Sequence, residues 1–506
     1  MNYNKSKGVR RLLIAIFAVS KKDWMNKDDN LGRLLLLLLI TLFICLAAYF
    51  LPNQLFGYKI KKIDLLADLR VEPKIPSMDS LRIELEQPDT LQIDSLALRD
   101  SLQKTIGIDS VSLALRDSLY KVMYAEVGSD SLGTRIEDYS VGHIGLRRFF
   151  TALRMSQQEN RPVRIAFLGD SFIEGDIVVA DFRSAMQKKF GGAGVGFVPI
   201  TSVAAQFRPT VKQKVEGWDT WSMLVDEERA YTLSGVNFTP STEHPMVSVQ
   251  TTERYPESDT VSSLKFFYEK NIQTEMSLIC NGWTDTIRKV LDHTSSITQY
   301  ECEGTFSEAT FAFADTAGFQ ALGVALEDNS GVIVDNYSLR GNSGMTLTRL
   351  DSTRCRELNA IRPYDLVILQ YGLNIITDTV LQYGWYGKRM EEAVRHIQVC
   401  FPNADVLMLG VSDRSRLVNG SFETMPAVLA LLHVQRRTAR RTGITFWNVF
   451  GAMGGENSMV RYVENNWASK DYTHLSFRGG KEIATALFNA LLKEKEFYDE
   501  VEKEEY

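Results

Sequence analysis

The chain has 506 residues, with 57 Lys and Arg against 63 Asp and Glu, for a formal net charge of −6. A composition of 44% hydrophobic and 24% charged residues is typical of a folded protein, and this length favours two or three units rather than one. Nothing in this balance indicates a basic face, so we predict no nucleic-acid partner.

Residues 34–51 form an uninterrupted apolar run with a single threonine. At about 1.5 Å per residue the run just spans a hydrocarbon core of about 30 Å, so we predict a transmembrane helix. Eight Lys and Arg residues precede it and three follow closely, which predicts that residues 1–33 are cytoplasmic and that the remainder lies outside. The prediction is a single-pass protein of the inner (cytoplasmic) membrane with a periplasmic, extracytoplasmic folded part.

Two other features of the N-terminal region bear on this prediction. A cleaved signal peptide is the alternative, but its basic leader would be unusually long and no small-residue cleavage site is evident. Residues 12–19 are too short to span a bilayer, and we expect them to lie on the inner membrane surface beside their basic neighbours.

Residues 52–138 are predicted to be an acidic, low-complexity stalk. Asp-Ser-Leu begins at 79, 94, 100, 117 and 130, and LALRDSL occurs at both 96–102 and 113–119. Such a segment has too few large side chains for its own core, although short helices or a modest self-associating seam are alternatives. We interpret it as a spacer between the membrane and the folded part.

The central motif is VRIAFLGDSFIEGD, residues 163–176. Its apolar first half predicts a buried strand, and residues 176–190 have the spacing of an amphipathic helix. Ser171 therefore falls at a strand-to-helix turn, where the first N–H groups of the helix lack internal partners and can receive an oxyanion. Gly-Asp-Ser alone is a weak signal, so the hypothesis of a nucleophilic serine requires a base and further donors at other strand ends.

Residues 206–328 are predicted to form an inserted antiparallel β-sandwich. Short alternating segments such as SLKFFYEK, TEMSLIC and SEATFAFAD are separated by turn residues, with few candidate helices. The region carries Trp218, Trp221 and Trp283, whose rings would either stack on sugars or belong to the core.

The five cysteines predict no metal site, because none of them has CxxC spacing. Cys45 lies in the predicted membrane span. An oxidising compartment would permit one disulfide, between Cys280 and Cys302. Buried free thiols, including Cys355 and Cys400, are the alternative.

The pattern of an α/β domain returns after the insert. Strands are predicted at 331–338, 365–370, 405–410 and 444–449, and helices at about 348–360, 387–400 and 478–493, with another between the last two strands. Such alternation predicts a parallel sheet with helices on both faces, and ligands in such sheets bind at the carboxyl ends of the strands. We therefore expect 139–205 and 329–495 to form one domain, followed by a charged tail at 496–506.

Polar and glycine residues follow the predicted strands at that edge. The GNSG segment that ends at Gly344 can offer a backbone N–H, and the side-chain amide of Asn374 can donate toward a developing negative charge. Before the last helix, Asp471 and His474 are three residues apart in a predicted tight turn, so the carboxylate can hold one ring nitrogen while the other faces Ser171.

Together these residues resemble the four blocks of the SGNH hydrolase superfamily, also called GDSL esterases. Gly169-Asp170-Ser171 is similar to the first block, Gly344 to the second, Gly372-Leu373-Asn374 to the third, and Asp471 with His474 to the fourth. The resemblance implies a flavodoxin-like three-layer α/β/α fold and a catalytic mechanism without metal or organic cofactor.

The resemblance also implies the role of each residue. Ser171 would be the nucleophile, His474 the general base and then acid, and Asp471 the residue that orients the histidine. The oxyanion hole would consist of the N–H groups of Ser171 and Gly344 and the Asn374 amide, with Asp170 and Gly372 in supporting positions, as the family's motif has them.

The long gap between the first and second blocks points to a narrower group. An inserted β-rich domain behind a membrane anchor is similar to peptidoglycan and polysaccharide O-acetylesterases and O-acetyltransferases, in which the insert resembles a carbohydrate-binding module. The implied function is a serine esterase that removes acetyl groups from a cell-envelope glycan. An O-acetyltransferase partnered by a multi-pass membrane acyltransferase, or a catalytically idle glycan-binding protein, are the alternatives.

Overall fold

The computed structural model describes residues 54–55, 58–59, 135–156, 158, 161–282 and 285–505. The chain divides into residues 1–76 and 77–506, and the first unit contributes the hairpin β1 (Gln54–Leu55) and β2 (Tyr58–Lys59). Within the described ranges, no helix combines the length and apolar character needed to cross a membrane. The predicted span at 34–51, the surface segment at 12–19 and most of the stalk lie outside these ranges.

A six-stranded sheet forms the centre of the α/β domain. In sheet order its strands are β16 (Val332–Ser338), β4 (Val163–Gly169), β17 (Leu366–Gln370), β18 (Asp405–Leu409), β21 (Thr445–Trp447) and β3 (Ile136–Asp138). The first five are parallel, and their chain order is 2-1-3-4-5, which is the flavodoxin-like order. The predicted α/β architecture is thus confirmed, with its topological switch point at β4.

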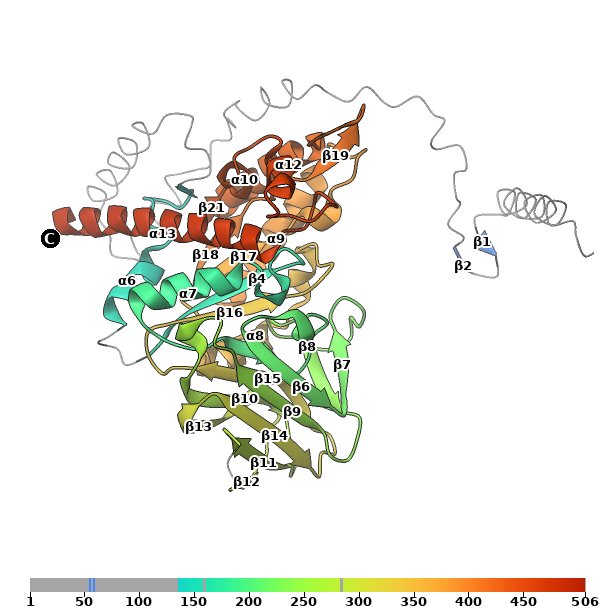
Figure 1. Cartoon of the computed structure of the whole chain (residues 1–506), viewed down its shortest axis with the longest axis vertical. Helices are drawn as coiled ribbons and strands as arrows, with labels where there is room; N and C mark the ends of the chain where they lie inside the picture. The colour runs from blue at the N-terminus through green and yellow to red at the C-terminus, as the bar shows by residue number, and fades with distance from the viewer. Residues whose placement is uncertain are drawn as a thin grey trace, which may run out of the picture. The chain divides into compact units, whose positions relative to one another are not determined.

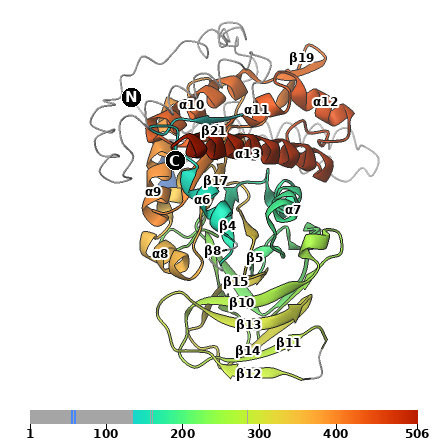
Figure 2. The ribbon, with the colours of Figure 1, turned by 90° about the vertical axis from the view of Figure 1, so that its left-hand side faces the viewer.

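Helices cover both faces of this sheet (Figures 1 and 2). They are α6 (Arg147–Met155), α7 (Val179–Phe190), α8 (Ser352–Ile361), α9 (Gly384–Cys400), α10 (Pro426–Thr442), α11 (Val449–Ala452), α12 (Ser458–Glu464) and α13 (Phe477–Glu505). Helix α7 packs against α13, whereas α9 packs between α8 and α10. Because the crossover from β4 to β16 runs opposite to the later ones, its helix lies on the other face.

Three boundaries of this domain differ from the prediction. Residues 196–199, which belong to the predicted first part at 139–205, form a strand that pairs with the sheet of the insert. Residues 136–138, which we assigned to the stalk, form the antiparallel edge strand β3, and Ile136 is fully buried there. The final helix, predicted to end near 493 before a charged tail, continues as α13 to Glu505. It continues because Tyr498 and Val501 are buried, and the Tyr498 ring packs edge-on against Phe150.

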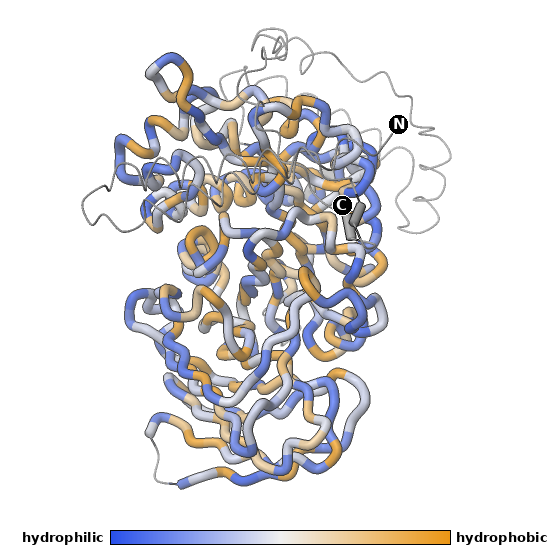
Figure 3. The backbone as a smooth tube through the Cα atoms, turned by 90° about the vertical axis from the view of Figure 1, so that its right-hand side faces the viewer, coloured by the Kyte–Doolittle hydropathy of each residue, from blue (hydrophilic) through white to orange (hydrophobic). Residues whose placement is uncertain are grey.

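The insert consists of two antiparallel sheets that enclose a second core. One holds β13 (Thr298–Phe306), β10 (Val261–Lys270), β15 (Gln320–Glu327), β8 (Val236–Pro240), β7 (Trp218–Ser222) and β5 (Gly196–Pro199). The other holds β12 (Ile287–Val290), β11 (Glu275–Cys280), β14 (Glu308–Ala314), β9 (Met246–Thr251) and β6 (Val211–Glu216). Buried and less buried residues alternate along β9 and β14, so the predicted sandwich is confirmed. Figure 3 shows hydrophobic and hydrophilic residues interspersed along the backbone.

The aromatic and sulfur side chains of the insert are mostly structural. The Trp218 ring packs against Phe313 and Phe319, and the Trp221 ring is covered by the Arg229 guanidinium at 3.7 Å. Neither ring is therefore an open platform for a sugar, and Trp283 lies outside the described residues. The four cysteines of the described part are free thiols, so the predicted alternative disulfide between 280 and 302 is not formed.

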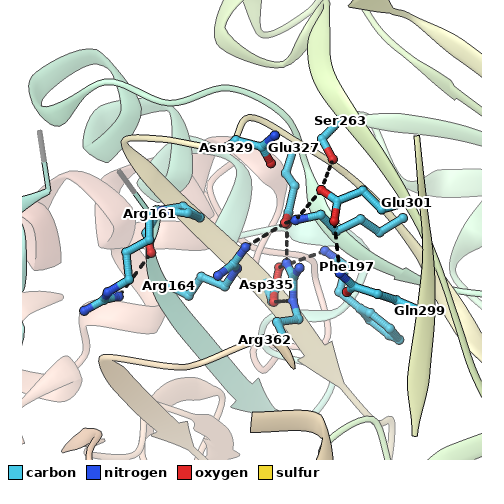
Figure 4. Close-up of polar contacts among 12 residues, drawn as sticks. Arg161, Arg164, Phe197, Ser263, Gln299, Glu301, Glu327, Asn329, Asp335 and Arg362 are labelled. Carbon is cyan, nitrogen blue, oxygen red and sulfur yellow. Dashed lines mark hydrogen bonds and ion pairs between the residues drawn. The ribbon is translucent and has the colours of Figure 1, made fainter. Parts of the chain in front are cut away.

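A buried ionic cluster joins the insert to the parallel sheet (Figure 4). Glu327, at the end of β15, accepts hydrogen bonds from Arg164 of β4 at 2.9 Å, from Lys265 of β10 at 3.1 Å and from Arg362 at 2.5 Å. Burial alone would raise the pKa of Glu327, but the three cations hold it well below its usual value. Arg362 also binds Asp335 of β16 at 2.7 Å, so one guanidinium ties both parts together. Removing a single member would leave an uncompensated buried charge.

Candidate active site

The structure brings three predicted site residues into a hydrogen-bonded row. Ser171 lies just after β4, and its Oγ is 3.4 Å from Nε2 of His474. Nδ1 of the same ring is 2.7 Å from Oδ2 of Asp471. The two ends of this row are 300 positions apart in the sequence. The fold joins them because β4 and β21 are parallel strands of one sheet, so the segments that follow them lie at the same carboxyl edge. A serine hydroxyl next to an imidazole that a carboxylate orients can be activated as a nucleophile.

Asp471 is well suited to hold the histidine in one tautomer. Its Oδ1 accepts hydrogen bonds from Ser469 Oγ at 2.5 Å and from the N–H groups of Thr473 and His474 at 3.0 Å. Partial burial would raise the pKa of Asp471, but these donors and the His474 ring lower it below its usual value. The ionised Oδ2 therefore accepts a proton-bearing Nδ1, and the lone pair of Nε2 faces Ser171.

A short hairpin supports the loop that carries Asp471 and His474. It consists of β19 (Ser415–Val418) and β20 (Ser421–Thr424), and the Phe422 ring stacks on the Tyr472 ring with centroids 3.6 Å apart. Tyr472 has a φ of 54°, a left-handed conformation that is costly for a tyrosine and is held by the surrounding contacts. The position of the loop is thus determined by packing that is distant in sequence.

Asp170 and Asn374 meet next to Ser171. Asn374 lies in the 3₁₀ turn η7 (Leu373–Ile375) after β17, and its Nδ2 donates to Oδ2 of Asp170 at 2.9 Å. The other oxygen of Asp170 accepts from the N–H of Phe172. Burial raises the pKa of Asp170 to about 7, against these hydrogen bonds. The structure therefore connects the first and third sequence blocks directly.

Two of the three predicted oxyanion donors already donate hydrogen bonds within the structure, and Asn342 accepts both of these bonds. The N–H of Gly344 donates to Oδ1 of Asn342 at 2.9 Å, and Asn374 Nδ2 donates to the main-chain oxygen of Asn342 at 3.0 Å. No acceptor in the described part of the chain takes the Ser171 N–H. An oxyanion formed at Ser171 would thus meet one unengaged donor and draw the other two away from neutral amide oxygens, which are weaker acceptors.

Gly372 and Gly344 occupy backbone conformations that require glycine. Gly372 has a φ of 131°, and a Cβ there would lie 2.9 Å from Nε2 of Gln435, whose amide donates to the main-chain oxygen of Tyr371. Gly344 has a φ of 87°, and a Cβ there would lie 2.9 Å from both Met390 Sδ and the Tyr371 ring. Both glycines therefore hold the turns that carry the predicted donors.

Replacing Gly344 with alanine is expected to lower kcat for an acetyl ester by about 100-fold, because the new Cβ displaces the N–H from its position. The strain should also lower the free energy of unfolding by about 1–3 kcal/mol. Initial rates on p-nitrophenyl acetate and a urea titration measure the two effects. Gly341→Ala is the matched control, since its φ is 79° but no atom lies within 4 Å of the new Cβ. Equal kcat values for the two variants would contradict a donor role for Gly344.

Sequence reasoning missed several residues that shape the site. Asp176 is fully buried five residues after Ser171 and receives hydrogen bonds from Arg183, Arg208 and Thr210. Burial opposes its ionisation, but the two arginines hold the pKa of Asp176 far below its usual value. Arg208 and Thr210 belong to the start of the insert, so the insert is anchored on the segment that follows Ser171. The acidic residues of the FIEGD segment, residues 172–176, were the signal in the sequence that could have indicated these contacts.

A second ion pair borders the same turn. Arg340, which precedes the GNSG segment, donates through Nε to Glu174 at 2.8 Å. Its side chain is two-thirds exposed, whereas that of Glu174 is nearly buried.

Among the described residues, no group of three or more His, Cys, Asp and Glu side chains is arranged to hold a metal ion.

The chain thus has a flavodoxin-like α/β domain with a serine, a histidine and an aspartate in hydrogen-bonded contact at the carboxyl edge of its parallel sheet. No family model and no curated protein matches this chain by sequence. A solved structure described as "Peptidoglycan O-acetylesterase in action, 5 min" aligns with 71% of this chain and 98% of its own, with a TM-score of 0.56 and 21% identity. This likeness confirms the resemblance at the level of the fold, including the inserted domain.

Other solved structures match less closely. A family two carbohydrate esterase from Cellvibrio japonicus aligns with 57% of this chain and 99% of its own, with a TM-score of 0.24 and 10% identity. A salicylyl-acyltransferase from a tetracycline biosynthetic pathway aligns with 59% of this chain and 96% of its own, with a TM-score of 0.27 and 13% identity.

Proposed function

We propose that this protein is a serine esterase that removes acetyl groups from a cell-envelope glycan. The observation that carries the proposal is the row from Ser171 Oγ through the His474 ring to Asp471, at 3.4 and 2.7 Å. The shared fold with a peptidoglycan O-acetylesterase supports the choice of substrate. The catalytic roles of these residues are part of the proposal.

The first half of the reaction acylates the enzyme. Ser171 Oγ attacks the ester carbonyl carbon as its proton passes to His474 Nε2, and Asp471 stabilises the resulting imidazolium. The carbonyl oxygen becomes an oxyanion that the Ser171 N–H, the Gly344 N–H and the Asn374 amide receive. Collapse of the intermediate breaks the bond to the sugar oxygen, which leaves with the proton from His474, and an acetyl-serine remains.

The second half releases acetate. His474 takes a proton from a water molecule, whose oxygen attacks the acetyl-serine carbonyl carbon. A second oxyanion forms and collapses, and Ser171 Oγ leaves with that proton. Transfer to another sugar hydroxyl in place of water would give the O-acetyltransferase alternative, with a multi-pass membrane acyltransferase as acyl source.

We also propose that the apolar run at 34–51 anchors the protein in the inner membrane with the site on the periplasmic side. The support is the length of the run and the excess of basic residues before it. An anchored enzyme would act on glycan within reach of its stalk.

Acetate release from O-acetylated peptidoglycan tests the proposed activity. The full chain in detergent is expected to release acetate from this polymer and to form an acetyl adduct on Ser171 that mass spectrometry detects during turnover. A parallel reaction contains an acetyl donor and de-acetylated glycan, where net acetylation of the glycan would favour the transferase. If the protein released no acetate and formed no acetyl adduct, the esterase proposal would be contradicted. The glycan-binding alternative would then remain.

A further inference from the structure

Arg414 lies against the turn that carries Asn374. Its Nη1 donates to the main-chain oxygens of Leu373 at 3.4 Å and of Ile376 at 3.3 Å, on either side of Asn374. Both bonds are long, so they leave the guanidinium only partly satisfied. Arg414 therefore borders the third sequence block without being locked into it.

The other side of Arg414 borders the loop of the base. Ser415, the next residue, begins β19 and donates its N–H to the main-chain oxygen of Tyr472 at 3.2 Å. Tyr472 lies between Asp471 and His474. Arg414 thus lies between the turn that carries Asn374 and the loop that carries Asp471 and His474, next to the hairpin of β19 and β20.

The guanidinium of Arg414 is not paired with a carboxylate of the residues that the structure describes. Within the described part of the chain Arg414 forms no ion pair, and its Nε and Nη2 have no hydrogen-bond partner and are not sealed from solvent. The adjacent carboxylate of Asp413 is buried and accepts hydrogen bonds from Thr424, Ser458 and the N–H of Met459.

Two other acids near the site are paired with other arginines, and Asp471 and Asp170 are engaged with His474 and Asn374. Asp378 pairs with Arg416 at 3.6 Å, and Glu174 pairs with Arg340. Among the described residues around the site, Arg414 therefore provides a half-buried positive charge whose Nε and Nη2 are available to a ligand.

We propose that Arg414 binds a carboxylate of the substrate close to the acetyl ester, so that the enzyme acts on acidic rather than neutral glycans. A planar guanidinium whose Nε and Nη2 are both free to donate matches the two oxygens of a carboxylate, and such charge-assisted bonds are stronger than neutral ones. Partial burial lowers the screening by water and increases the selectivity of the contact. This inference rests on the proposed esterase function and specifies its substrate class.

Two small esters that differ only in a carboxylate test the proposal. They are the methyl glycosides of glucuronic acid and of glucose, each with one O-acetyl group at the same position. The full-length wild type is expected to show a kcat/KM about tenfold or more higher for the acidic ester. Arg414→Gln should lower kcat/KM for the acidic ester by about 10- to 100-fold, mainly through KM, and leave the neutral ester within about twofold. Arg414→Lys, which keeps the charge but loses the planar fork, should retain part of the preference.

Arg416→Gln is the matched control, since it removes a charge two residues away that is already paired, and the preference should persist. An equal fall of both esters in Arg414→Gln would overturn the proposal, because it would mean that Arg414 only supports the Asn374 turn. A wild type without preference would also overturn it. A wild type inactive on both esters and on p-nitrophenyl acetate would instead refute the esterase function, and this inference with it.

Discussion

Replacing Ser171 with alanine is expected to lower kcat/KM for p-nitrophenyl acetate by about 10⁴-fold or more, because no other group in the row can form the acyl intermediate. The side-chain oxygen has one hydrogen-bond partner, His474, and the residue is only half-buried. Its removal should therefore leave thermal unfolding within about 0.5 kcal/mol of the wild type. Initial rates and a melting curve on the same preparation separate chemistry from folding.

A serine in the insert provides the control for this experiment. Ser277 lies in β11, is also half-buried and is remote from the row, so Ser277→Ala should keep wild-type rates. If Ser171→Ala kept more than a tenth of wild-type activity while it remained folded, Ser171 would not be the nucleophile. The esterase function would then be refuted, whatever the geometry of the His474 ring.

The central architecture was predictable because the inner strands are mostly apolar, although Arg164 interrupts β4. Val163 to Leu168 is buried at every position, and a parallel sheet covered on both faces requires that pattern. The edge strand β3 gave no such signal, since it has three residues of which only Ile136 is apolar, and its burial depends on pairing with Trp447. Its antiparallel direction is a long-range property that no local pattern carries.

The extension of the last helix beyond residue 493 could not be predicted for a different reason. Phe497, Tyr498 and Val501 have helical spacing, but they stand among charged residues that we interpreted as a tail. Their burial follows from the partners that the fold supplies, such as Asp138, which accepts a hydrogen bond from the Tyr498 hydroxyl at 3.2 Å.

The positions of the site segments followed from one rule, whereas their detailed contacts did not. Residues after parallel strands share an edge, which is why the segments of Ser171, Gly344 and Asn374 could be placed together before any contact was known. Asn342 accepts the Gly344 N–H only because of the orientation of its side-chain amide. The position of Arg414 depends on a hairpin of two four-residue strands. Neither feature has a periodicity that a sequence displays.

Replacing Asp471 with asparagine is expected to lower kcat by about 10³- to 10⁴-fold, more than replacement with alanine, although asparagine is nearly isosteric. The reason is the set of donors around Oδ1, namely Ser469 Oγ and the N–H groups of Thr473 and His474. These donors require an oxygen, so an asparagine would keep its carbonyl there and turn its NH₂ toward Nδ1 of His474. An NH₂ group donates, and it would force the proton of the ring onto Nε2.

A protonated Nε2 cannot accept the proton of Ser171, so the asparagine variant would hold the base in the wrong tautomer. Alanine at 471 imposes no tautomer, and because the Asp471 side chain is half exposed, water can reach the N–H groups that lose their acceptor. The measurement is kcat on p-nitrophenyl acetate for both variants, together with the ¹⁵N shifts of the His474 ring, which distinguish the two tautomers. A fall that is larger for alanine than for asparagine would mean that Asp471 acts through loop stability rather than through the proton on Nδ1.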